Sequence, residues 1–104
     1  MLKVYGSRMC PDCVACKANF DAYQIPYEFL DINDSLRTLK DFLILRDREP
    51  VFDHLKKIDD IGIPACITED GTVFTDWEGY LKEQGWEVKT AETGQACSLD
   101  HKGC

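Results

Sequence analysis

Residues 2–13 read LKVYGSRMCPDC and join a short β-prone run to the start of a helix. Leu2-Lys3-Val4-Tyr5 forms the run, and Gly6-Ser7 ends it. Proline is tolerated at the first helical position, where its missing N–H needs no partner. Pro11 therefore places Cys10 at or near the N-cap of a helix, and apolar residues at helical spacing extend this helix to about Tyr23.

Apolar patterns and turn residues elsewhere in the chain predict three further strands and three further helices. We expect strands at residues 27–32, 63–68 and 72–74, and helices from residue 36, from residue 50 and over residues 77–83. The charged run at residues 46–49 is expected to interrupt the first of these helices. Asp70-Gly71 predicts a tight turn between the last two strands.

This order of elements, β-α-β-α-(α)-β-β-α, predicts an α/β fold. A β-α-β start implies a parallel pair of strands with a right-handed crossover, and the Asp-Gly hairpin adds an antiparallel pair. We expect a central mixed four-stranded sheet flanked by helices. Residues 1–89 are expected to form one domain, and the polar residues 90–104, with Cys97 and Cys104, a C-terminal tail.

The charge balance and the hydropathy exclude several kinds of partner. The 104-residue chain has 12 Lys and Arg against 19 Asp and Glu, which gives a formal net charge of -7. Nucleic acids and anionic membranes need a basic face, so neither is expected as a partner. No apolar run approaches the roughly 18 to 20 residues that span a bilayer. These features predict a soluble, cytoplasmic protein.

Six cysteines are an unusual number for a chain of this length. Redox chemistry, metal binding and structural disulfides are all possible uses of closely spaced cysteines. Cys10, Cys13 and Cys16 lie within seven residues, too close together to connect distant parts of a fold. The chain also has enough Leu, Ile, Val and Phe to build a core. Redox chemistry is therefore the favoured interpretation.

Cys10 and Cys13 have the spacing of a reactive dithiol. A thiolate at a helix N-terminus is stabilised by the helix dipole and by unpaired backbone N–H groups, so its pKa falls. Cys13 lies one helical turn further on, close enough to form a disulfide with Cys10. We expect Cys10 to attack a substrate disulfide and Cys13 to resolve the resulting mixed disulfide.

These residues resemble the glutaredoxin branch of the thioredoxin superfamily over about residues 2–84. Lys3-Val4-Tyr5-Gly6-Ser7 leads into Cys10-Pro11-Asp12-Cys13 much as a glutaredoxin's first strand leads into its Cys-Pro-x-Cys site. Gly62-Ile63-Pro64 is similar to the family's Thr-Val-Pro segment. The resemblance implies a thioredoxin fold, a cis proline at Pro64 that faces the active-site disulfide, and thiol–disulfide oxidoreductase activity with glutathione as the reductant.

The resemblance also implies residues that bind substrate. Ile63 would offer its backbone to a bound thiol peptide such as glutathione, next to Pro64. Thr75 and Asp76 would lie at the N-terminus of the last helix, where backbone N–H groups can hold a carboxylate. Arg8 loosely matches the family's basic residue before the motif. Asp12 stands where a glutaredoxin usually has an aromatic residue.

The remaining cysteines and histidines have simpler interpretations. Cys16 is expected to be a buried small hydrophobe or an auxiliary thiol, and Cys66 a buried residue of a central strand. Cys97, His101 and Cys104 could hold zinc or form a reactive tail. His54 is expected to be solvated.

We therefore expect a glutaredoxin-like dithiol enzyme that reduces protein disulfides or glutathionylated proteins and holds no tight cofactor or metal. Two alternatives stay open. One is a thioredoxin-like reductant served by a flavoprotein reductase. The other is a metal or iron–sulfur binding module that uses Cys10, Cys13 and Cys16, whose spacing is also found among iron–sulfur ligands.

Overall fold

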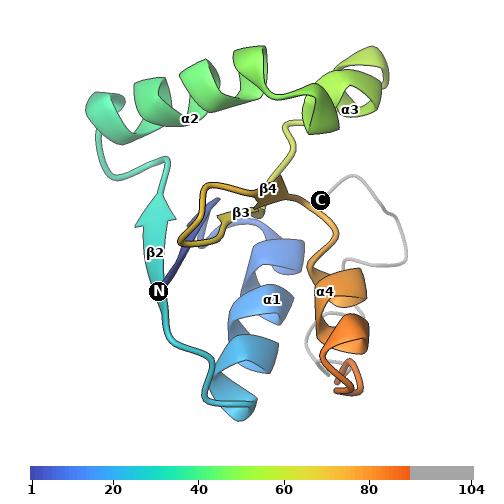
Figure 1. Ribbon diagram of the computed structural model, residues 1–104. Helices are drawn as coiled ribbons and strands as arrows, with labels where there is room; N and C mark the ends of the chain where they lie inside the picture. Colours follow the sequence, from blue (N-terminus) through green and yellow to red (C-terminus); the bar gives the residue numbers. More distant parts are fainter. Residues whose placement is uncertain (90–104) are drawn as a thin grey trace.

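A mixed sheet of four strands forms the centre of the computed structural model, which describes residues 1–89 of the chain (Figure 1). The strands stand in the order β2-β1-β3-β4. Their bounds are Leu2–Gly6 for β1, Tyr27–Asp31 for β2, Ala65–Ile67 for β3 and Val73–Phe74 for β4. Strand β1 is parallel to β2 and antiparallel to β3, and β3 is antiparallel to β4. The predicted α/β fold with a mixed four-stranded sheet is confirmed.

Helices cover both faces of the sheet (Figure 1). Helices α1 (Pro11–Ala22) and α4 (Trp77–Glu83) lie on one face. The other face carries α2 (Leu36–Arg48), the 3₁₀ helix η1 (Pro50–Phe52) and α3 (Asp53–Lys57). None of the helices in residues 1–89 is long and apolar enough to cross a bilayer.

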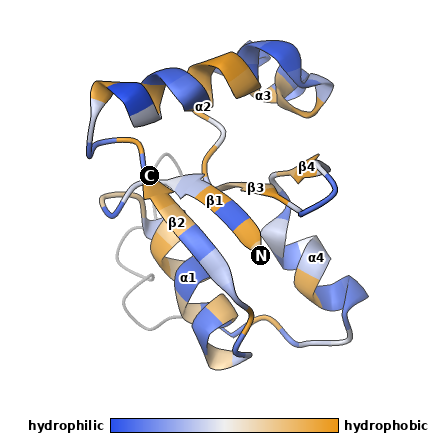
Figure 2. Ribbon diagram, turned by 60° about the vertical axis from the view of Figure 1, so that its left-hand side comes forward, coloured by the Kyte–Doolittle hydropathy of each residue, from blue (hydrophilic) through white to orange (hydrophobic). Residues whose placement is uncertain are grey.

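Alternation along the central strands divides the core into two clusters. Leu2 and Val4 of β1 pack with α1 and α4, whereas Tyr5 faces α2 and lies 6.0 Å from Phe42 between ring centroids. Figure 2 shows the corresponding change along β1 from hydrophobic to hydrophilic and back. Since successive side chains of a strand point to opposite faces, one short strand contributes to both clusters.

The charged run at residues 46–49 does not interrupt α2, so that prediction is wrong. The helix continues to Arg48 and ends at Glu49, whose backbone is extended. Charged side chains on a solvent-facing turn do not break a helix, whereas the residue before a proline is disfavoured in the helical conformation. Pro50, which follows Glu49, therefore sets the end of α2.

Strand β3 begins at Ala65, two residues later than predicted. The Ile63–Pro64 peptide bond is cis, as the resemblance implied, and Pro64 has no N–H to donate to the sheet. Gly62 before it has a φ of 95°, which favours glycine, and a Cβ there would lie 2.8 Å from the Phe52 ring. The missing N–H of Pro64 and the left-handed backbone of Gly62 delay the start of the strand.

After α4, residues 84–89 run back to α1. The side-chain amide of Asn19, which is 1% exposed, donates to the carbonyl of Lys89 over 3.1 Å and accepts from the N–H of Lys89 over 2.6 Å. The Trp86 ring stacks on Tyr23 with centroids 5.0 Å apart. Residues 84–89 are therefore attached to the domain. The predicted tail, residues 90–104, lies outside the described residues.

Candidate functional site

Cys10 is the N-cap residue of α1. Its backbone is extended, with a φ of -99° and a ψ of 117°, and Pro11 occupies the first helical position, as predicted. The N–H of Cys10 donates to the carbonyl of Ser7 over 3.1 Å, and its own carbonyl accepts from Val14 over 3.0 Å. The chain therefore turns tightly from β1 into the helix, and the Cys10 sulfur lies beside the first amides of α1.

The Cys10 thiol is acidified to a pKa of about 7. The largest cause is a hydrogen bond from the Cys13 thiol, which stabilises the thiolate. Burial acts in the opposite direction, the backbone N–H groups of Cys13 and Asp12 lower the pKa further, and the Asp12 carboxylate raises it slightly. Cys10 is 8% exposed and Cys13 is fully buried, so an incoming sulfur reaches Cys10 first.

Cys13 lies behind Cys10, against the end of β1. Its sulfur accepts from the N–H of Ser7 over 3.5 Å. A Cβ on Gly6 would lie 2.9 Å from that sulfur, so only glycine allows this close approach. The hydrogen bond to Cys10 and burial together raise the pKa of Cys13 far above its ordinary value. Cys10 is therefore the thiol that ionises near neutral pH, whereas Cys13 stays protonated.

Asp12 connects the cysteine motif to α4. Its Oδ1 accepts a hydrogen bond from Nε1 of Trp77 over 3.3 Å. Partial burial raises the pKa of Asp12, the Trp77 hydrogen bond lowers it, and the nearby Asp60 carboxylate raises it. Trp77 is 3% exposed, and nothing in the local sequence predicted its contact with the motif.

Pro64 lies beside the same part of β1. Tyr5 pairs with Ala65 in the sheet register, so one further step places Pro64 opposite Gly6, against which the Cys13 sulfur packs. Pro64 is fully buried, and Ile63 before it is half-buried. Pro64, just before β3, therefore lies near the end of β1, where Cys13 packs against Gly6.

Arg46 holds the loop that leads to Pro64. Its guanidinium donates to the carbonyl of Ile61 over 2.8 Å and to that of Asp60 over 2.7 Å. The N–H of Gly62 donates to the Asp60 carboxylate over 3.2 Å. Sequence reasoning treated Arg46 as part of a helix-breaking run and missed this role.

Arg8 is engaged by carboxylates of its own chain. Its guanidinium lies 2.8 Å from Asp31 and 3.1 Å from Asp34, and its backbone N–H also donates to Asp31. Asp31 is 3% exposed. Burial alone would raise its pKa, but hydrogen bonds from Asn33 and Arg8, with the Arg8 charge, hold it below the ordinary value. Sequence reasoning missed Asp31, although the acidic end of the second strand was a usable signal.

Thr75 and Asp76 precede α4, as expected. Asp76 is the N-cap, and its carboxylate accepts from the N–H of Gly79 over 3.0 Å. The carbonyl of Thr75 accepts from Trp77 over 3.0 Å. The side chain of Asp76 therefore occupies an amide that the resemblance assigned to a bound carboxylate.

Comparison with known proteins identifies a relative for this chain. An uncharacterized protein from Haemophilus influenzae is 34% identical over 73 residues, which cover 70% of this chain and 85% of that protein. The chain belongs to the family of that Haemophilus influenzae protein. No family model matches the sequence. No solved structure matches it either.

The other two cysteines within residues 1–89, Cys16 and Cys66, lie in the core. Cys16 and Cys66 are fully buried and carry free thiols, so their predicted burial is confirmed. His54 is exposed, as expected. Within residues 1–89, no group of three or more His, Cys, Asp or Glu side chains is arranged to hold a metal ion. The tail residues Cys97, His101 and Cys104 lie outside the described part.

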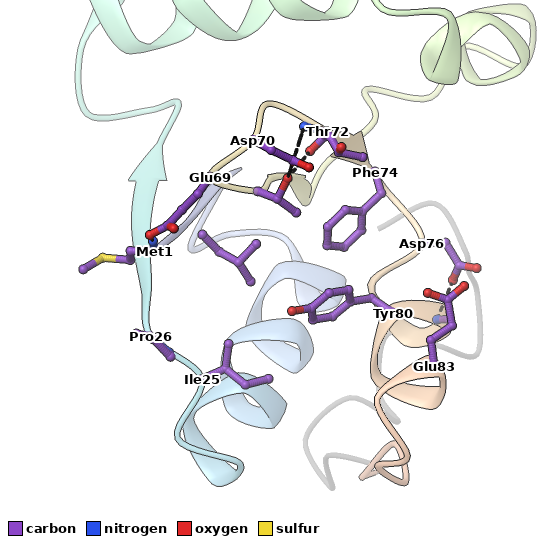
Figure 3. A pocket seen from close by; sticks show the side chains of 13 residues that line it. Met1, Ile25, Pro26, Glu69, Asp70, Thr72, Phe74, Asp76, Tyr80 and Glu83 are labelled. Atoms are coloured by element: carbon purple, nitrogen blue, oxygen red, sulfur yellow. Dashed lines mark hydrogen bonds and ion pairs between the residues drawn. The ribbon is translucent and has the colours of Figure 1, made fainter.

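A hollow of about 740 Å³ lies elsewhere on the domain (Figure 3). Ile25, Pro26, Phe74 and Tyr80 line it together with carboxylates that include Glu69. The Phe74 and Tyr80 rings stack with centroids 4.9 Å apart. Asp76 lines this hollow, but neither cysteine of the motif does.

Proposed function

We propose that this protein is a thiol–disulfide oxidoreductase of glutaredoxin-like type with a thioredoxin fold. The observation that carries the proposal is the position of Cys10 as the N-cap of α1, with the fully buried Cys13 one turn behind it. The Cys13 thiol lowers the pKa of Cys10 to about 7. A helix-end thiolate with a second thiol one turn behind it is the arrangement that dithiol exchange requires.

The two thiols have different roles in the proposed reaction. The Cys10 thiolate attacks one sulfur of a substrate disulfide, and the other substrate sulfur leaves with the electron pair. Cys13 then loses its proton and attacks Cys10, which releases the substrate as a thiol and leaves a Cys10–Cys13 disulfide. Bonding of Cys10 to the substrate removes the hydrogen bond and negative charge that raise the pKa of Cys13, so the second step becomes easier.

The fold supports this proposal through the position of the cis proline. A mixed sheet in the order β2-β1-β3-β4 with helices on both faces is typical of the thioredoxin fold implied by the resemblance. In the proposed reaction Pro64 lies near the dithiol and, having no N–H, donates no hydrogen bond there, while the half-buried Ile63 before it offers its backbone to the substrate. The proposed substrates are disulfide-containing or glutathionylated proteins in a reducing compartment such as the cytoplasm.

Glutathione is the proposed reductant, by the resemblance. A thioredoxin-like protein served by a flavoprotein reductase is the second candidate, and two observations favour it. Asp31 and Asp34 neutralise Arg8, and Asp76 caps α4 with its own carboxylate. A glutathione carboxylate would have to displace these groups or find another cation.

One experiment tests the proposed function and the choice of reductant. The full-length protein is assayed on a glutathionylated peptide and on a protein disulfide, and NADPH consumption is followed with glutathione plus its reductase or with a thioredoxin reductase. We expect Cys10→Ser to abolish both activities and Cys13→Ser to retain activity on the glutathionylated peptide alone. Full activity of Cys10→Ser would overturn the proposal.

A further inference from the structure

Two further thiols, Cys16 and Cys66, lie in the core between α1 and the sheet. Cys13 and Cys16 are one helical turn apart on the face of α1 that packs on the sheet, and both are fully buried. Cys13 lies against Gly6 of β1. Cys66 on β3 is the register partner of Val4, which is two residues from Gly6 on the same face of β1. Helix and sheet therefore bring Cys16 and Cys66 together.

Contacts in the core join this pair. Cys16 and Cys66 are members of the same buried cluster, with Val4 and Phe20 around them. The neighbouring Cys66 thiol and burial both raise the pKa of Cys16, as expected for two thiols in one buried cluster. Cys10 is 8% exposed, whereas solvent reaches none of Cys13, Cys16 and Cys66.

We propose that Cys16 and Cys66 form a second dithiol centre, which becomes oxidised by internal exchange with the Cys10–Cys13 disulfide. This inference rests on the proposed function of the outer pair. It gives a role to two buried thiols that the outer reaction does not use.

The exchange needs no electron acceptor or donor outside the chain. Cys16 loses its proton and its sulfur attacks Cys13, so the Cys10–Cys13 bond breaks, a Cys13–Cys16 bond forms, and Cys10 leaves with the electron pair. Cys66 then loses its proton and attacks Cys16, which breaks the Cys13–Cys16 bond and returns Cys13 to the thiol. The inner pair is oxidised to a disulfide and the outer pair is reduced, and the protons pass to Cys13 and to Cys10 or solvent.

The chemistry of the outer pair favours the first step. A thiol of low pKa is the better leaving group in thiol–disulfide exchange, and Cys10, with a pKa of about 7, is the group displaced from Cys13. The neighbouring Cys66 thiol and burial raise the pKa of Cys16 well above its ordinary value, which slows its attack. Shielding from solvent also keeps the inner pair from external oxidants, so its oxidation has to pass through Cys13.

Peptide mapping of the oxidised full-length protein tests this route. The protein is treated with a small disulfide oxidant, quenched in acid at increasing times, alkylated after denaturation and digested with trypsin. Residues 9–17 then form one peptide with Cys10, Cys13 and Cys16, and residues 58–82 form another whose only cysteine is Cys66. We expect the Cys10–Cys13 disulfide first, and later a cross-link between these two peptides.

Three variants identify the sulfurs and the route. Cys16→Ala and Cys66→Ala should each lose the cross-link while the Cys10–Cys13 disulfide still forms. Cys13→Ala should lose the cross-link although Cys16 and Cys66 are both present. Alanine is used because it leaves no polar group in the core, and circular dichroism verifies that each variant is folded.

The outcomes separate this inference from the proposed function. A stable Cys10–Cys13 disulfide with Cys66 fully alkylated would overturn the inference and leave the outer chemistry intact. A cross-link that survives in Cys16→Ala or in Cys13→Ala would also overturn it, because the sulfur or the route would be different. Failure to form the Cys10–Cys13 disulfide would contradict both.

Discussion

The indole N–H of Trp77 donates to Oδ1 of Asp12 over 3.3 Å and joins α4 to the cysteine motif across 65 positions of the chain. This bond holds a carboxylate beside the thiol pair. The carboxylate opposes the negative charge of the Cys10 thiolate, while the backbone N–H of the same residue stabilises it. Asp12 therefore moderates the acidity of Cys10.

Replacing Asp12 with asparagine should lower the pKa of Cys10 below about 7. Asp12→Asn removes the repelling charge but keeps the backbone N–H and an oxygen that can accept from Trp77. The change should be less than about one pH unit, since the interaction of charges near a protein surface is modest. The pH dependence of Cys10 alkylation measures it, and a rise in the pKa would contradict the argument. Trp77→Phe is the control that keeps the charge and removes the hydrogen bond.

The hydrogen bond from Cys13 should account for most of the acidity of Cys10. In Cys13→Ala the donor is lost, and the pKa of Cys10 should rise from about 7 toward its ordinary value of 9.0. Cys13→Ser keeps an O–H donor and should stay closer to the wild-type value. The reduced protein of each variant is titrated by following thiolate absorbance. Equal pKa values in the two variants would show that the thiol hydrogen bond is not the main cause.

Asp31 should stabilise the loop between β1 and α1. Asp31→Asn places an amide against the N–H groups of Arg8 and Asn33 and removes the ion pair, so we expect a loss of about 2 kcal/mol in the free energy of unfolding. Urea unfolding at neutral pH measures this loss.

The same residue predicts a pH dependence with a definite sign. The pKa of Asp31 is below its ordinary value of 3.8 in the folded protein. Its stabilising contribution is therefore complete above about pH 4 and is lost as the pH falls through the folded pKa. The difference in stability between wild type and Asp31→Asn should shrink on acidification. A difference that stays constant or grows in acid would contradict this assignment.

Truncation should distinguish the attached segment from the tail. A chain that ends at Lys89 keeps both hydrogen bonds to Asn19 and the stacking of Trp86 on Tyr23, so it should fold and retain the Cys10 chemistry. A chain that ends at Gln84 loses these contacts and leaves the buried Asn19 amide with fewer partners, at a cost of about 2 kcal/mol or more. Thermal unfolding compares the two. Equal stability of the two chains would show that residues 85–89 contribute nothing.

Some parts of this fold are specified by short stretches of the sequence. Pro11 marks the first residue of α1, and the final helix spans Trp77–Glu83 as predicted, because caps, turns and apolar spacing act over a few residues. The same local reasoning failed at residues 46–49, where α2 continues to Arg48 and Arg46 binds the loop before Pro64. A run of charged residues does not by itself indicate whether a helix continues or ends there.

The candidate site also has some features that a short stretch of sequence specifies and others that it does not. The sequence alone predicted that Cys10 caps the helix and that Cys13 lies one turn behind it, because one helical turn and one N-terminus determine both positions. Packing between distant segments decided the rest: Arg8 is paired with Asp31, Asp12 is bonded to Trp77, and Cys16 shares a buried cluster with Cys66. These contacts depend on the strand register and on which face α1 and α4 turn toward the sheet. Those features are set by the burial of the whole core, which no local pattern records.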